Sequence, residues 1–236
     1  MLPTALIVED EPEANKLLAM LVRLRGYRAD TAFTGGEALE KIRTRAPEIV
    51  FLDLMLPDIH GLQVCEAVKA GPSTRLVPVV LVTARVAAEN RAKGFEAGAD
   101  DYIAKPYTPD LIFRALAEAD ALRAAAGSAE VAGTVGGRAG GEPEHARQRA
   151  RFAGLLRART PLVEDQIARL IARLGRPGAV GIPPEFAYRL VPGSIALTLP
   201  EGDPCPDAPP DPFDEVGRTD SGGCVLIKRF SIETPS

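Results

Sequence analysis

Hydrophobic residues in the first half of the chain alternate between short unbroken runs and longer stretches with helical spacing. The unbroken runs are typical of strands that are buried on both faces, and the spaced stretches are typical of amphipathic helices. We expect strands at residues 5–8, 28–32, 48–53, 79–83 and 102–104, and helices at residues 11–24, 35–45, 61–70, 87–97 and 109–123. Five strands alternating with five helices predict an α/β fold with a parallel sheet covered on both sides.

The second half has a different pattern. Residues 125–145 are rich in alanine and glycine, which predicts a flexible linker because such a segment buries little apolar surface. Helices are expected at residues 146–159 and 162–174, and a strand at 224–227. The pattern therefore predicts three parts: residues 1–124, a linker at 125–145, and a smaller α+β region at 146–236 of unknown type.

Composition narrows the class of protein. The 236 residues carry a formal net charge of −4 and include two histidines and three cysteines, Cys65, Cys205 and Cys224. None of the cysteines forms a CxxC pair, which favours reduced thiols, although a bond between Cys205 and Cys224 stays open. No apolar run approaches the roughly 20 residues of a membrane helix, and the start of the chain does not resemble a signal peptide. We expect a cytoplasmic protein without a membrane partner.

Polar residues follow the predicted strands of the first half. Glu9 and Asp10 follow the first strand, and Asp53 ends the third. Thr83 ends the fourth strand and Lys105 follows the fifth. The carboxyl ends of parallel strands lie at one edge of a sheet, where ligands bind in such folds. Clustered carboxylates repel one another unless a cation joins them, and oxygen ligands of this kind suit Mg²⁺. Asp53 could then act as a carboxylate nucleophile toward phosphorus.

Four motifs carry a family resemblance: LIVEDEP at residues 6–12, FLDLMLPD at 51–58, VTA at 82–84 and GADDYIAKP at 98–106. In this order and spacing they resemble the receiver domains of two-component response regulators, over about the first 124 residues. The resemblance implies a flavodoxin-like, doubly wound, five-stranded parallel sheet with strand order 2-1-3-4-5. It also implies phosphorylation by a sensor histidine kinase or a phosphotransfer protein, and no enzymatic activity beyond the protein's own phosphorylation and dephosphorylation.

The resemblance assigns roles by position. Asp53 matches the phosphoacceptor. Glu9 and Asp10, together with Asp53 and the backbone carbonyl of Met55, match the Mg²⁺ ligands.

Further positions match the residues that respond to phosphorylation. Thr83 matches the hydroxyl residue that takes part in both catalysis and switching. Lys105 matches the catalytic lysine that contacts the phosphate, and Tyr102 matches the switch aromatic. The peptide bond between Lys105 and Pro106 is expected to be cis. Met55 and Arg85 match the two positions that flank the approach of water. Neither side chain supplies a carboxylate or amide that would orient the water, which predicts slow self-dephosphorylation.

The output of the second half stays open between two classes. Apolar stripes at residues 152, 155 and 156 and at 167, 170, 171 and 174 could bind a partner protein or a second copy of the chain, but could equally pack within their own domain. A run of arginines between residues 147 and 159 could contact DNA, yet the rest of the region is acidic, and a solvated helix face explains the run better. Residues 213–228 faintly resemble the closing hairpin of anti-sigma-factor-type ATPase domains, without room for the nucleotide-binding motifs.

Overall fold

The computed structural model describes residues 2–71, 73–126, 130–135, 142–160, 186–191, 194–199, 205–209, 213–219 and 223–229. The chain divides into two compact units, Met1–Arg123 and Ala124–Ser236. Each unit has its own five-stranded sheet.

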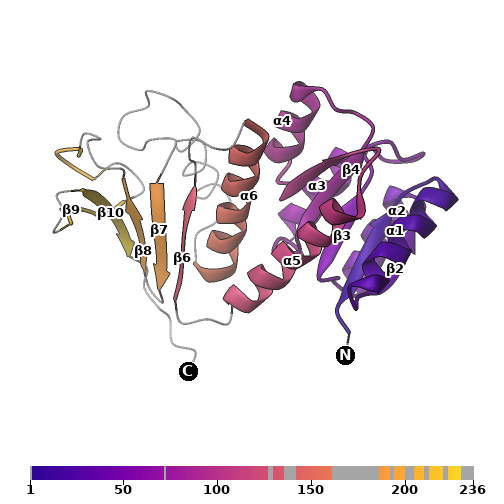
Figure 1. Ribbon diagram of the computed structural model, residues 1–236, viewed down its shortest axis with the longest axis horizontal. Coiled ribbons are helices and arrows are strands. Elements are labelled where there is room, and N and C mark those ends of the chain that lie inside the picture. Colours follow the sequence, from indigo (N-terminus) through magenta and orange to yellow (C-terminus); the bar gives the residue numbers. More distant parts are fainter. Residues whose placement is uncertain are drawn as a thin grey trace. The chain divides into compact units, whose positions relative to one another are not determined.

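The first unit is the predicted α/β fold (Figure 1). Its five strands are parallel and lie in the order β2-β1-β3-β4-β5, as predicted. The strands are β1 (Thr4–Val8), β2 (Arg28–Ala32), β3 (Ile49–Leu52), β4 (Val79–Thr83) and β5 (Asp101–Ala104). The helices are α1 (Pro12–Leu24), α2 (Gly35–Thr44), α3 (Gly61–Ala70), α4 (Ala88–Glu96) and α5 (Pro109–Ala126).

Apolar layers on both faces of this sheet explain the unbroken hydrophobic strands. Successive residues of a strand point to opposite faces. Ala5 and Ile7 of β1 therefore join a core beneath α1 and α5, whereas Leu6 and Val8 join a second core beneath α2 and α3. Every residue of β1, β3 and β4 is buried. These three strands leave room for polar side chains only at their ends, which is where the candidate site lies.

The second unit is an α+β structure. Its sheet has the order β6-β7-β8-β10-β9, and every neighbouring pair is antiparallel. The elements are β6 (Val131–Val135), α6 (Glu142–Arg159), β7 (Phe186–Val191), β8 (Ser194–Thr198), β9 (Glu215–Arg218) and β10 (Cys224–Arg229). Helix α6 packs on the sheet through Phe152, whose ring centroid lies 5.5 Å from that of Phe186 and 4.7 Å from that of Tyr188.

The structure corrects the linker predicted at residues 125–145, and it decides between the two alternatives for the first apolar stripe. Strand β6 lies inside the predicted linker, because Val131–Val135 pairs along its whole length with β7. The apolar stripe of α6 faces its own sheet: Phe152, Leu155 and Leu156 are all buried, so this stripe is not free for a partner. The helix predicted at residues 162–174, with the second stripe, lies outside the described residues.

The cysteines differ from the expectation as well. Cys205 and Cys224 form a disulfide, with their Cα atoms 5.2 Å apart, although the sequence favours reduced thiols. The pairing depends on the fold: Cys224 opens β10, and the Cys205 sulfur lies 3.9 Å from the carbonyl of Gly217 on the neighbouring β9. Cys65 is buried in α3 and carries no disulfide.

Candidate functional site

The predicted site residues come together at the carboxyl edge of the first sheet. Backbone hydrogen bonds hold the strand ends in register: Asp53 N donates to Val8 O at 2.9 Å, and Lys105 N donates to Thr83 O at 2.9 Å. Residues that are 96 positions apart in sequence, such as Glu9 and Lys105, therefore become neighbours. The parallel order of the strands alone accounts for this convergence.

Three carboxylates form a cluster at this edge. Glu9, Asp10 and Asp53 each offer a carboxylate oxygen, and these oxygens lie within 4.8 Å of one another. Glu9 and Asp53 are 4% and 7% exposed, whereas Asp10 is open to solvent. Burial raises the pKa of Glu9, and the nearby Lys105 opposes that rise. The cluster thus combines two shielded carboxylates with one on the solvent side.

Lys105 joins the two buried carboxylates. Its ammonium donates to Asp53 Oδ2 at 2.6 Å and also to Glu9 Oε2. Burial acts to lower the pKa of Lys105, but its hydrogen bonds to Asp53 and Glu9 outweigh burial and raise it. The lysine therefore stays charged and offsets the negative charge of the cluster.

The donor set fits a small, hard divalent cation. All three side chains offer oxygen, and Mg²⁺ binds through one or two carboxylates while keeping several waters. The exposure of Asp10 leaves solvent access on one side of the cluster. The cluster of Glu9, Asp10 and Asp53 is thus able to hold Mg²⁺.

The loop after β3 fixes the position of Asp53. Met55 N donates to Asp53 Oδ1 at 3.1 Å, which orients the carboxylate. Helix α3 begins against the same residue: a Cβ added to Gly61 would lie 2.2 Å from the Asp53 carbonyl oxygen. Only glycine permits this close approach.

Thr83 and Tyr102 are both tied to Arg85. The Thr83 hydroxyl accepts from Arg85 N at 3.4 Å, and the Tyr102 hydroxyl donates to the carbonyl of Arg85. Thr83 is 1% exposed and Tyr102 is 6% exposed, so both point inward. Burial raises the pKa of Tyr102, so its hydroxyl remains a donor at neutral pH. Thr83 and Tyr102 are therefore connected through the backbone of a single residue, Arg85.

Met55 and Arg85 lie beside each other at the mouth of the site. Arg85 Nε is 3.2 Å from the Met55 sulfur, and the Met55 side chain is 48% exposed. An apolar thioether and a cation therefore lie side by side in the loops that follow β3 and β4.

Two supporting interactions were not predicted. Asp58 accepts from Gly35 N at 2.7 Å and from Gly36 N at 2.8 Å, which pins the start of α2 to the β3–α3 loop. These hydrogen bonds lower the pKa of Asp58. Asp58 lies within the motif at residues 51–58, but its partners are more than 20 positions away, so no local pattern indicates them.

The second unpredicted interaction is a buried ion pair. Lys69 donates to Asp100 at 2.6 Å and to Val77 O at 2.8 Å, and both charged side chains are less than 10% exposed. Asp100 also accepts from Val79 N at 2.8 Å. In the sequence, this pair is indicated only by Lys69, which occupies a position on the apolar side of α3.

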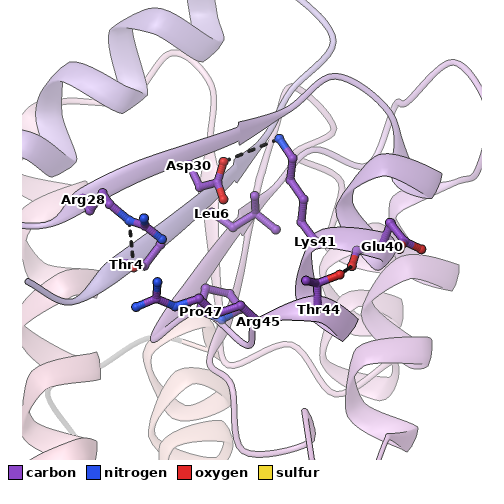
Figure 2. A pocket seen from close by; sticks show the side chains of 9 residues that line it. All are labelled: Thr4, Leu6, Arg28, Asp30, Glu40, Lys41, Thr44, Arg45 and Pro47. Atoms are coloured by element: carbon purple, nitrogen blue, oxygen red, sulfur yellow. Dashed lines mark hydrogen bonds and ion pairs between the residues drawn. The ribbon is translucent and has the colours of Figure 1, made fainter. Parts of the chain in front are cut away.

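A shallow hollow lies at the opposite end of the first sheet. It is lined by Thr4, Leu6, Arg28, Asp30, Glu40, Lys41, Thr44, Arg45 and Pro47. Figure 2 shows Lys41 turned toward Asp30, and Arg28 bonded to Thr4. The hollow is at the amino ends of β1 and β2, so it is separate from the carboxylate cluster.

Comparisons with known proteins agree with this geometry. Residues 5–117 match the family model of the response regulator receiver domain. The chain is 37% identical over 115 residues to the phosphate regulon transcriptional regulatory protein PhoB of Rhizobium meliloti, covering 48% of this chain and 51% of that protein. It is 43% identical over 105 residues to the sensory transduction protein RegX3 of Mycolicibacterium smegmatis, covering 44% and 45%. The chain thus spans about half the length of the curated relatives it matches.

A solved structure resembles the first unit. It is a Chloroflexus aurantiacus protein described as a response regulator, 34% identical, which aligns with a TM-score of 0.50 over 51% of this chain and 99% of its own length. Among the described residues, no helix is both long and apolar enough to cross a membrane.

Proposed function

Because this chain is a response regulator with a receiver domain at residues 5–117, we propose that Asp53 accepts a phosphoryl group and that the resulting switch controls the second unit. The donor is a phosphohistidine of a sensor kinase or of a phosphotransfer protein. The observation that carries the proposal is the ammonium of Lys105, which contacts both buried carboxylates of the cluster.

The reaction is a transfer to a carboxylate. An oxygen of Asp53 forms the new bond to phosphorus, the bond between phosphorus and the donor nitrogen breaks, and the imidazole leaves with the bonding electrons. Met55 N holds the other oxygen of Asp53, which keeps the attacking one in place. Lys105 neutralises part of the charge that spreads over the phosphoryl oxygens.

Glu9, Asp10 and Asp53, with the Met55 backbone carbonyl, would hold Mg²⁺, which supplies further positive charge next to the transferring group. Lys105 cannot fill this role alone, because one unit of positive charge faces three carboxylates. In the phosphorylated state, we expect the contact between Glu9 and Lys105 to be partly lost, because Lys105 then contacts the phosphoryl group.

The switch runs from Thr83 to Tyr102. The Thr83 hydroxyl is a donor for a phosphoryl oxygen on Asp53, and it now accepts from Arg85 N. If Thr83 turns toward the phosphoryl group, that hydrogen bond changes and so does the position of Arg85. The Tyr102 hydroxyl donates to the carbonyl of Arg85, so Tyr102 moves when Arg85 moves. This movement changes the surface around α4 and β5.

The phosphorylated state is expected to persist. Hydrolysis requires a water in line with the new bond, and the Met55 thioether cannot orient one. The Arg85 guanidinium can donate to a phosphoryl oxygen and so stabilises the ground state. Slow self-dephosphorylation suits a regulator whose output changes over minutes.

The output belongs to the second unit, which we place at residues 146–236 together with strand β6. Regulation through protein contact or dimerisation is the first candidate. DNA binding is the alternative, because several relatives, PhoB of Rhizobium meliloti among them, are named transcriptional regulatory proteins. An electrophoretic shift with non-specific DNA at two salt concentrations distinguishes the two, since phosphate contacts weaken steeply with salt.

Phosphorylation itself is tested with acetyl phosphate. Intact-mass spectrometry should show one phosphoryl adduct that requires Mg²⁺ and is absent from Asp53→Asn. Asp58→Asn is the matched control, because Asp58 lies in the loop after β3 but outside the carboxylate cluster. An Asp53→Asn variant that gains the same adduct at the same rate would contradict the proposal.

A further inference from the structure

Among the residues that the structure describes, one face of the second sheet is only partly covered. Residues alternate between the two faces along each strand, and in β7 the burial alternates accordingly. Phe186, Tyr188 and Leu190 are buried on the face beneath α6, whereas Ala187 and Arg189 remain accessible on the other. Phe152 of α6 packs against Phe186 and Tyr188, so α6 covers the face on which these two residues lie. We call the other side the outer face.

The strand register defines the outer face. Its central row runs across all five strands and consists of Ala132, Arg189, Ala196, Ile227 and Glu215. The adjacent row consists of Thr134, Ala187, Thr198, Val225 and Gly217. A Cβ added to Gly217 would meet nothing within 4 Å, so the space above this face is open there.

The composition of the outer face is unusual for a surface in water. A solvated face of an antiparallel sheet normally carries polar side chains. Here the middle strands present Ala187, Ala196, Val225 and Ile227, all partly exposed, together with Thr198. The charged residues Arg189 and Glu215 lie on β7 and β9, and Arg229 lies at the end of β10. An apolar centre with a charged rim is the composition of a protein interface.

We propose that the outer face binds the outer face of a second copy of this chain. The two sheets would stack about a two-fold axis that is parallel to the strands and passes between β8 and β10. This operation places β8 opposite β10 of the second copy, and β7 opposite its β9. A two-fold interface of this kind uses the same surface on both copies.

Steric complementarity favours this arrangement. Ala196 and Ile227 are directly paired within the sheet, so the two-fold axis sets each Ala196 opposite the Ile227 of the other copy. A small side chain then faces a large one twice across the centre, which lets the two layers interdigitate. Stacked sheets of this type cross at about 30°.

Charge complementarity favours the same axis. Arg189 stands on β7 and Glu215 on β9, in the same row and at opposite sides of the centre. The axis brings each Arg189 to the Glu215 of the other copy. Within one chain these residues pair with Glu130 and Arg229, but all four side chains are at least 45% exposed, and exposed pairs exchange at little cost.

The size of the face predicts a reversible dimer. Four strands about 4.8 Å apart and five residues of about 3.3 Å each span roughly 20 by 17 Å. This is less than the roughly 800 Å² per partner of a standard stable interface. We therefore expect dimers that dissociate on dilution.

Charge exchange provides the decisive test on the full-length chain. Arg189→Glu and Glu215→Arg should each weaken self-association at least tenfold, because each places like charges opposite one another. An equimolar mixture of the two variants should associate as well as the wild type, since opposite charges then meet at both sides. Sedimentation equilibrium over a wide concentration range measures this, with one variant carrying a fluorescent label.

Two further variants separate the centre from the edge. Ile227→Asp should abolish association, whereas Thr134→Asp should leave it unchanged, because β6 has no opposing strand in this arrangement. Circular dichroism checks that each variant is folded. A wild-type chain that stays monomeric at the highest concentration, or a mixture that associates no better than the separate variants, would overturn the proposal.

Discussion

The two sheets of this protein differ in where their side chains are accessible to ligands or partners. In the first unit the strands are parallel, and β1, β3 and β4 are buried along their whole length, so the side chains at the ends of these strands are the ones that reach solvent. In the second unit the strands are antiparallel, and burial alternates along β7 and β8. A sheet covered on both faces concentrates its functional groups at one edge, whereas a sheet covered on one face exposes a broad surface. A sheet covered on both faces therefore suits a localised reaction site, and a sheet covered on one face suits an interface.

The two units also differ in the solvent exposure of their ion pairs. The first unit contains a buried pair, Lys69 with Asp100, and the half-buried Lys105, which contacts the buried Asp53. In each described ion pair of the second unit at least one side chain is exposed, as with Arg229 and Glu215. Buried pairs require exact partners, and exposed pairs can exchange them. We therefore expect the first unit to be sensitive to charge substitutions and the second to depend mainly on apolar contacts.

The largest effect on the second unit should come from Phe152→Ala. The Phe152 side chain is fully buried against Phe186 and Tyr188, and its loss leaves a cavity that costs about 3–5 kcal/mol. Hydrogen exchange followed by mass spectrometry should show lost protection in β7 and β8 but not in β1 and β3. Phe33→Ala, at a 42% exposed position, is the control and should change little. Equal loss of protection in both sheets would show that the units are not independent.

The corresponding change in the first unit is Lys69→Met. It leaves Asp100 buried without its cation, and breaking a buried pair in this way costs about 3–5 kcal/mol. Chemical denaturation followed by hydrogen exchange should place the loss in the first unit. Lys93→Met removes an exposed partner of Glu89 on α4 and should leave stability nearly unchanged. If both lysine variants behave alike, burial of charge is not what distinguishes the first unit.

A smaller effect is expected on the lifetime of the phosphorylated state. Replacing Met55 with Asn and Arg85 with Glu supplies an amide and a carboxylate that can orient water, and should accelerate the loss of phosphate on the order of tenfold, or about 1.4 kcal/mol of barrier. The decay of the adduct, followed by intact mass, measures the rate. Val86→Asn, at an exposed position next to Arg85, is the control. Unchanged decay in the double variant would mean that water reaches Asp53 without passing these side chains.

The smallest effect concerns pH and Tyr27. Burial, followed by the hydrogen bond to the Asp120 carboxylate at 2.6 Å, raises the pKa of Tyr27 above its ordinary value of 10.0. Its contribution to stability is complete below pH 10 and is lost as the pH rises further, because the unfolded chain then ionises first. Tyr27→Phe should lower the free energy of unfolding at neutral pH by about 1 kcal/mol. The alkaline decline should also become shallower. Urea denaturation at several pH values tests both, and an unchanged alkaline decline would argue against the role of this hydroxyl.

The first unit was largely predictable from the sequence, for a physical reason. Buried parallel strands require continuous apolar residues, so runs such as residues 49–52 are visible in the sequence and mark their own ends. Once the strands are parallel, residues that follow them must meet at one edge. The position of Asp53 among Glu9, Asp10 and Lys105 thus follows from the pattern and from the family resemblance together.

Only the tertiary structure decided the remaining features. Strand β6 consists of weakly hydrophobic residues beside glycines, and becomes a strand because β7 supplies its hydrogen bonds. The partners of Asp58 and the carboxylate partner of Lys69 lie more than 20 residues away, beyond the reach of any local pattern. The disulfide of Cys205 and the outer face of the second sheet depend on the strand order β8-β10-β9. Local sequence determines which segments can form strands, but pairing between distant segments determines which side chains meet.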